Sequence, residues 1–92
     1  MERVIYMACI YILYSQHLDR FYIGSTNDLD RRLQEHASGK TITTSKTNDW
    51  ILKAFFDFQT LDQARQKEHK LKGMKSRKIL ERIVRNRKLT IT

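Results

Sequence analysis

Proline is absent from this sequence, while glycine occurs three times and cysteine once. The single cysteine excludes an intramolecular disulfide and a zinc site made of cysteines. Cys9 lies within an apolar run, where a buried thiol is the simplest interpretation. No linker, repeat or low-complexity stretch divides the 92 residues, so we expect one domain over residues 1–92. The cysteine usage suits a reducing compartment, and we expect a cytoplasmic location.

Long hydrophobic runs are also absent. The longest, from Val4 to Leu13, is far shorter than the stretch of about 20 apolar residues that a membrane-spanning helix needs. The segment SQHLDR that follows it offers no small-residue site for a signal peptidase. We therefore expect no membrane association and interpret the run as a strand buried on both faces.

Acidic residues are scarce in the second half of the chain. Residues 1–50 contain six Lys/Arg and six Asp/Glu, whereas residues 51–92 contain twelve and four, so the net charge of +8 arises in the second half. Eleven basic residues fall between Arg65 and Lys88 against two acidic ones, which exceeds what solubility needs. This asymmetry favours a nucleic-acid partner over the alternative of an ordinary solvated helix surface.

Periodicity and turn residues predict three strands and three helices in the order ββαβαα, an α+β fold. The predicted strands are residues 4–14, 20–24 and 50–58, and the later helices are residues 61–72 and 76–87. The first two strands form an antiparallel hairpin. The first helix begins after its N-cap Asn27 and stops at Gly39, after Ser38. Gly73 divides the later helices, and Ser76 caps the last one.

The second predicted helix carries a carboxylate on its inward face. Leu61, Ala64 and Leu71 mark that face, and helical spacing places Glu68 on it as well. A buried carboxylate without a partner is costly, so Glu68 must pair with a basic residue or bind a metal ion. Periodicity alone favours a salt bridge, either to Arg32 or to a lysine at the edge of the face.

The first predicted helix has a comparable pattern. Its inward residues are Leu29, Leu33 and Ala37. Arg32 and His36 lie one turn apart on the flank of that face, and Arg31 should face solvent. Taken singly, His36 is typical of a hydrogen-bonded core histidine, and Tyr11 and Tyr22 are typical of sheet packing.

Together these side chains form a set suited to phosphodiester chemistry. A hard divalent cation accepts a single carboxylate when water and phosphate oxygens complete its shell, which suits Mg²⁺ better than Zn²⁺. Arginine can stabilise the charge that develops on a phosphate. A tyrosine can take a proton from water only if nearby positive charge lowers its pKa far below the ordinary value of about 10.

Three segments resemble the GIY-YIG endonuclease superfamily, and closely its small standalone bacterial members: CIYIL at 9–13, YIGSTNDLDRRLQEH at 22–36 and ARQKEHKLK at 64–72. The resemblance covers residues 4–84. Its most specific part is YIG with an arginine ten residues after its tyrosine, followed later by an alanine–glutamate helix. It implies a three-stranded antiparallel sheet flanked by three helices, and hydrolysis of DNA phosphodiester bonds with one metal ion, Mg²⁺ or Mn²⁺.

The resemblance also implies roles for individual residues. Tyr11 matches the first-motif tyrosine, a general base or water-orienting group, and Tyr22 matches the second, which contacts the water or the phosphate. Arg32 matches the arginine that stabilises the phosphate. His36 matches an assisting histidine, and Glu68 matches the glutamate that binds the metal.

The sequence departs from the family pattern at two points. Gly24 ends the second motif and lets the chain turn closely, but Cys9 replaces the glycine of the first motif, which keeps Tyr6 and Tyr14 as alternatives to Tyr11. A later asparagine or lysine that contacts the phosphate in some members is not assigned. Its candidates are Lys72, Lys75 and Asn86.

We expect an endonuclease of low sequence specificity, because no zinc-finger or helix-turn-helix pattern is present. It would act on DNA shape, breaks or damage, as in repair, or under the direction of a targeting protein; RNA stays open as a substrate, and so does the oligomeric state. The residues expected to hold the nucleic-acid backbone are Arg31, Lys67, Lys70, Lys72, Lys75, Arg77 and Lys78.

Two alternatives to this function stay open. The first is a nucleic-acid-binding module that has the same fold and no useful catalytic rate. The second takes SRKILERIVRNRK, residues 76–88, as a basic amphipathic helix for anionic membranes or partner proteins. The apolar residues of that helix are more simply explained as part of the core. They are Ile79, Leu80, Ile83 and Val84.

Overall fold

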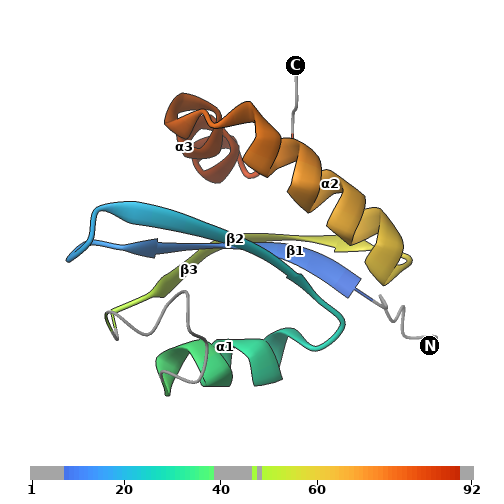
Figure 1. Cartoon of the computed structure of the whole chain (residues 1–92), viewed down its shortest axis with the longest axis horizontal. Helices are drawn as coiled ribbons and strands as arrows, with labels where there is room; N and C mark the ends of the chain where they lie inside the picture. Colours follow the sequence, from blue (N-terminus) through green and yellow to red (C-terminus); the bar gives the residue numbers. More distant parts are fainter. Residues whose placement is uncertain (1–7, 39–46, 48, 90–92) are drawn as a thin grey trace.

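A small sheet forms the middle layer of the protein, with helix α1 on one face and helices α2 and α3 on the other (Figure 1). The computed structural model describes residues 8–38, 47 and 49–89. In these residues the elements are β1 (Ala8–Ser15), β2 (Arg20–Thr26), α1 (Leu29–Ala37), β3 (Ile51–Phe58), α2 (Leu61–Met74) and α3 (Arg77–Asn86). The α+β class and the order ββαβαα are therefore confirmed.

Strand β1 lies at the centre of the sheet, antiparallel to β2 on one side and to β3 on the other. This position explains its continuous apolar sequence, because a central strand covered on both faces has no solvated side. Tyr11 pairs with Gly24 of β2 and with Phe55 of β3. Residues 4–7 of the predicted first strand lie outside the described residues.

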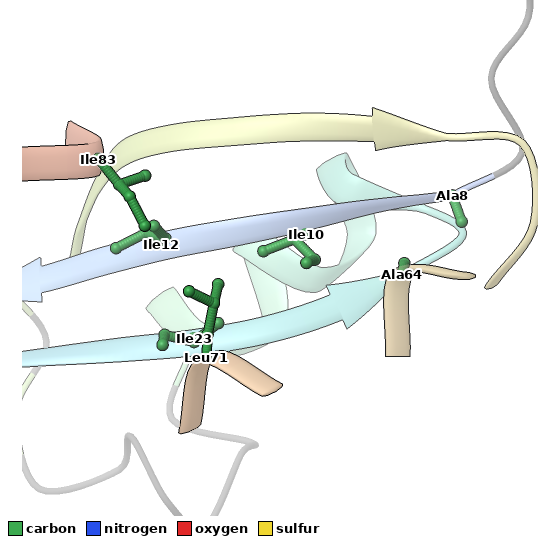
Figure 2. Packing of buried hydrophobic residues seen from close by; sticks show 7 residues of the cluster. All are labelled: Ala8, Ile10, Ile12, Ile23, Ala64, Leu71 and Ile83. Atoms are coloured by element: carbon green, nitrogen blue, oxygen red, sulfur yellow. The ribbon is translucent and has the colours of Figure 1, made fainter. Parts of the chain in front are cut away.

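The side chains of β1 alternate between two different environments. Ala8, Ile10 and Ile12 join the core cluster beneath α2 and α3 (Figure 2), whereas Tyr11 contacts His36 of α1 on the opposite face. The helices contribute to the core Ala64, Leu71 and Ile83. Their burial confirms the predicted inward face of α2.

Helix α3 also packs with its apolar side on this core. Ile83 is fully buried, and the neighbouring side chains packed against the cluster are Ile79, Leu80 and Val84. The apolar stripe of residues 76–88 is thus part of the fold, as the sequence favoured. Within the described residues, no helix combines the length and the apolar character that crossing a bilayer requires.

The predicted boundaries of β2 and α1 need correction. Strand β2 continues to Thr26, because Thr26 still pairs with Cys9. The N-cap of α1 is Asp28, not Asn27, since the Asp28 carboxylate accepts a hydrogen bond from the Arg31 N–H. Ser38 is the C-cap, and the predicted stop at Gly39 lies outside the described residues.

Gly73 does not divide α2 from α3. Helix α2 continues through it to Met74, and Lys75 forms the left-handed C-cap with a φ of 50°. A single glycine costs a helix only about 1 kcal/mol, which packing easily offsets. Ser76 caps α3 as predicted, accepting a hydrogen bond from the Ile79 N–H.

The inward face of α1 is centred on a different residue from the one predicted. Ala37 is exposed, Leu29 and Leu33 are half-buried, and His36 is buried. The hydrogen bond between His36 and Tyr11 accounts for this rotation, because it draws the polar flank of α1 onto the sheet. Arg31 is exposed, as predicted.

Candidate active site

A tyrosine and a glycine on neighbouring strands form the base of the candidate site. Tyr11 and Gly24 are paired across β1 and β2, and a Cβ atom at position 24 would overlap the Tyr11 phenol. Only glycine therefore lets this ring lie across β2. Tyr14 points elsewhere, since its hydroxyl donates to Asp19 near the hairpin, and Tyr6 lies outside the described residues. Of the two described alternatives, Tyr11 is the one at the candidate site.

The Tyr11 hydroxyl and the imidazole of His36 form a buried pair. The hydroxyl lies 2.9 Å from His36 Nε2, and each residue is 1% exposed. Burial, together with the positive charge of Arg32, lowers the pKa of His36 below its ordinary 6.5. The imidazole is therefore neutral at pH 7, and in the tautomer protonated on Nδ1 its Nε2 accepts the phenol proton.

A tyrosine that acts as a base on its own needs a lowered pKa, whereas the pKa of Tyr11 is raised. Burial, and next the neighbouring Tyr22, raise the pKa of Tyr11, whereas Arg32 lowers it by less. The phenol is thus neutral over the physiological pH range. A phenolate base at Tyr11 is not what this environment stabilises.

Tyr22 lies on the same face of the sheet, with its ring among other aromatic rings. The ring centroids are 6.2 Å from Tyr11, 5.0 Å from His36 and 6.3 Å from Trp50. Sequence reasoning placed Trp50 in a strand and gave it no role at the site. The structure places it directly before β3.

Trp50 follows an aspartate that ties several segments together. The Asp49 carboxylate accepts hydrogen bonds from Ser15 Oγ at 2.6 Å, Thr47 Oγ1 at 2.7 Å and the His17 N–H at 2.9 Å. These bonds, that of Ser15 first, lower the pKa of Asp49 to about 2. A charged Asp49 thus anchors the chain just before Trp50 to the end of β1.

Glu68 reaches the β2 edge of the sheet from α2. Its side chain is 19% exposed, and Lys72 Nζ donates to Oε2 at 2.6 Å. The hydroxyl of Ser25 donates to Oε1. A lysine partner was one of the two predicted; the other, Arg32, forms an ion pair with Glu35 at 3.3 Å instead. Sequence reasoning missed Ser25, although it directly follows the YIG motif.

Lys72 joins the two sides of the site. Its ammonium pairs with Glu68 and also lies 5.8 Å from the centroid of the Tyr22 ring. Arg32 completes the arrangement from α1, where its charge influences the pKa values of both Tyr11 and His36. The candidate residues from β1, β2, α1 and α2 are therefore brought to one region, at the β2 edge of the sheet.

The donor set of this region fits a hard divalent cation. No group of three or more His, Cys, Asp or Glu residues suited to a metal ion occurs in the part of the chain that the structure describes. Glu68 is the carboxylate that the candidate residues bring to the β2 edge. Mg²⁺ and Mn²⁺ accept such sites when water and phosphate oxygens supply the other ligands. The Lys72 ammonium on Glu68 Oε2 already marks a position that accepts positive charge.

The predicted backbone-binding residues fall into separate groups. Lys72, Lys75 and Arg77 line a groove beside β2, whereas Lys67 and Lys70 line another depression with Phe58. The remaining two are exposed on helices on opposite faces of the sheet (Figure 1): Arg31 on α1 and Lys78 on α3.

Comparison with known families agrees with this geometry. The family model described as the GIY-YIG catalytic domain matches residues 7–81. The chain therefore belongs to the GIY-YIG family, whose catalytic domain implies a nuclease function and a nucleic-acid substrate. No curated protein gives a significant match, and neither does any solved structure.

Proposed function

We propose that this protein is an endonuclease that hydrolyses DNA phosphodiester bonds with one divalent ion, Mg²⁺ or Mn²⁺, and that residues 1–92 act as one catalytic domain. One observation carries the proposal. Five side chains of the types that this chemistry needs meet at the β2 edge although they come from four different elements. They are Tyr11, Tyr22, Arg32, His36 and Glu68.

In this proposal Glu68 is the metal ligand, and the hydroxyl of Ser25 orients its carboxylate. The bound ion would polarise the phosphate and stabilise negative charge on it. Arg32, whose side chain is 41% exposed, remains accessible to substrate and would stabilise charge on the phosphate oxygens. Tyr22 would orient the attacking water or the phosphate.

Proton transfer is assigned to the buried pair. As water attacks the phosphorus and the bond from phosphorus to the leaving oxygen breaks, the Tyr11 oxygen accepts a proton from the water and the Tyr11 hydroxyl proton passes to His36 Nε2. The leaving oxygen takes up a proton from solvent. The 2.9 Å separation supports this relay. The lowered pKa of His36 keeps its imidazole able to accept the proton at neutral pH. The relay does not require a phenolate before the reaction, which the raised pKa of Tyr11 disfavours.

Substrate choice follows from how the basic residues are presented. Exposed lysines and arginines on helix surfaces contact phosphates, which position a protein on DNA without reading its sequence. We therefore infer an enzyme of low sequence specificity. It would recognise DNA breaks, branches or damage, as in repair, or be directed to DNA by a targeting protein. The proposed location is the cytoplasm, which the single cysteine suits. RNA is tested as an alternative substrate.

Cleavage assays with a matched pair of variants test the proposal. Wild type, Glu68→Gln and the exposed α3 control Glu81→Gln would be incubated with labelled duplex, nicked, flap and branched DNA and with RNA, in Mg²⁺, Mn²⁺ or EDTA. We expect metal-dependent cutting of DNA by wild type and Glu81→Gln, and loss of cutting with retained binding for Glu68→Gln.

The competing function is a nucleic-acid-binding module without useful turnover. The complete burial of the Tyr11 side chain favours it, because a buried hydroxyl has limited access to water. Tight binding without cleavage of any substrate would contradict the endonuclease proposal and support this module. Cleavage of RNA alone would overturn the assignment to DNA.

A further inference from the structure

A groove runs along β2 beside the corner where α2 meets α3, outside the catalytic cluster. Its apolar lining consists of Phe21, Ile23, Leu71 and Leu80. Its polar rim consists of Arg20, Lys72, Lys75, Ser76, Arg77 and Asp19, and the Asp19 carboxylate pairs with Arg77. Its volume of about 270 Å³ is just below that of pockets that enclose small molecules, about 300–1,000 Å³. The groove therefore suits a chain that passes along it better than an enclosed ligand.

The groove is continuous with the candidate active site. Lys72 belongs to both, because it lines the groove and its ammonium pairs with Glu68. Glu68 and Lys72 are four residues apart and share one side of α2, and Lys75 is the C-cap at the end of the same helix. Glu68 contacts Ser25 near the end of β2, whereas Lys75 lines the groove with Phe21 near its start. This side of α2 therefore runs along β2.

The length of this side matches a short piece of a nucleic-acid strand. From Glu68 to the end of α2 at Met74, six residue steps of α-helix rise about 9 Å, which is close to the axial length of about three nucleotides of a B-form strand. A strand whose scissile phosphate lies at Glu68 can thus reach Lys75 within a few nucleotides.

The basic residues of the rim have different tasks. Arg77 is already engaged: it donates to the Asp19 carboxylate at 2.6 Å and to Glu81 at 3.1 Å, and its guanidinium lies 5.7 Å from the centroid of the Phe21 ring. It builds the end of the groove. Arg20 and Lys75 are exposed rim residues, and with Lys72 they present positive charge to a phosphate backbone.

We propose that this groove binds the nucleic-acid strand adjacent to the scissile phosphate, with Arg20, Lys72 and Lys75 as its phosphate ligands. The inference deepens the proposed endonuclease function and rests on it for the position of the scissile phosphate. The inference departs from the expectation that Lys67 and Lys70 also hold the backbone, since these two lysines line a depression that has none of the candidate catalytic side chains. The strand leaves the site along β2 and not across that depression.

The test compares two double variants of equal charge. Arg20→Gln/Lys75→Gln removes two rim charges, and Lys67→Gln/Lys70→Gln removes two charges from α2 outside the groove. Binding to a nicked duplex would be measured by fluorescence anisotropy in EDTA at several salt concentrations, after circular dichroism has confirmed that both variants fold. For the groove variant we expect about tenfold weaker binding, and a plot of log affinity against log salt concentration whose slope is smaller by about two. For the control variant we expect the affinity to change by about threefold or less.

A neutral-linkage scan then locates the strand. Single methylphosphonates would replace successive phosphates on either side of the nick. We expect wild type to lose affinity at two or more adjacent positions on one side, and the groove variant to be insensitive at those positions. Equal losses in the two double variants, or a methylphosphonate profile unchanged in the groove variant, would overturn the inference.

The outcomes separate this inference from the function on which it rests. Wild type that binds but does not cut contradicts the endonuclease proposal, while the scan still decides the groove because it measures binding alone. Cleavage combined with an unchanged scan retains the endonuclease and rejects the groove.

Discussion

The two faces of the sheet are built from the same strands but serve different ends. Toward α2 and α3 the side chains are aliphatic, and Ile10 and Ile12 are completely buried in the core (Figure 2). Toward α1 the same strand presents Tyr11, which is equally buried but is hydrogen-bonded to His36. Period-two alternation along one central strand thus supplies a stabilising face and a chemical face.

The comparison teaches how a small domain accommodates a polar site. Burying a hydroxyl and an imidazole is costly unless they are paired, and here each is the partner of the other. Both oxygens of the Glu68 carboxylate are also paired: Ser25 donates a hydrogen bond to one, and Lys72 donates to the other. The aliphatic face needs no such pairing, because its buried side chains carry no polar groups.

The largest effect should follow from a cavity in the aliphatic face. Ile12→Ala removes a side chain that is 0% exposed, and we expect the free energy of unfolding to fall by about 2–5 kcal/mol. The control Ile51→Ala, at a side chain 54% exposed, should change it by about 0.5 kcal/mol. Urea unfolding measures both, and similar losses would contradict the assignment of stability to the α2/α3 face.

A methyl group on the chemical face should have the next largest effect. Gly24→Ala places a Cβ against the Tyr11 phenol, so we expect the free energy of unfolding to fall by about 1–3 kcal/mol. Because the ring must also move, the folded variant should cleave DNA more slowly than wild type. At Gly73 an added Cβ meets nothing within 4 Å, and Gly73→Ala should stabilise α2 by about 0.5–1 kcal/mol. Normal activity of Gly24→Ala at a temperature where it is folded would contradict a fixed position for Tyr11.

A smaller effect should appear in the pH dependence of the free energy of unfolding, because His36 lies on the chemical face. The folded-state pKa of His36 is lowered from 6.5, so the unfolded chain binds the proton more readily. This contribution to stability is complete above pH 6.5 and is lost as the pH falls from about 6.5 through the folded-state pKa. Urea unfolding between pH 7.5 and 5.5 should show a weaker pH dependence for His36→Gln than for wild type.

Cleavage should lose rate in the same acidic range, since a protonated His36 cannot accept the proton from Tyr11. The acidic limb of the profile should therefore lie below pH 6.5. A wild-type limb at or above pH 7, or identical stability profiles for wild type and His36→Gln, would contradict a neutral buried imidazole.

The smallest effect concerns Lys72, the lysine beside the proposed metal ligand Glu68. Lys72 and Glu68 form an i,i+4 pair with a half-exposed lysine, and such pairs contribute about 0.3–0.5 kcal/mol. Lys72→Met should therefore strengthen Mn²⁺ binding in the absence of DNA by about twofold, as measured by calorimetry. Lys70→Met, which removes the same charge from α2, should have less effect; equal changes, or weaker binding by Lys72→Met, would contradict competition between the ammonium and the metal ion.

Much of the fold could be predicted because local patterns dominate it. The apolar run of β1, the inward leucines of α2 and the Ser76 cap are all properties of neighbouring residues. The failures lie at the ends of the elements. Thr26 extends β2 because Cys9 pairs with it, and α2 passes through Gly73 because the turn needs its left-handed residue only at Lys75.

The candidate site was predictable in its residue types but not in its connections. Motif spacing selected Tyr11, Tyr22, Arg32, His36 and Glu68, and their catalytic roles stay predictions until the variants are assayed. Periodicity ranked His36 as a flanking residue of α1, whereas the structure makes it the buried residue of that helix. Trp50 has no local signal for a place beside Tyr22, since its position depends on β3 pairing with β1.

The sequence by itself determined the order of the elements, the membership in the GIY-YIG family and the excess of positive charge in the second half, because these depend on residue types and their spacing along the chain. Only the tertiary structure decided that Glu68 pairs with Ser25, that Tyr11 pairs with His36, and that a basic groove continues from the site along β2. These features join residues that are far apart in the chain. Their free energies depend on burial and distance, which exist only after the elements have packed.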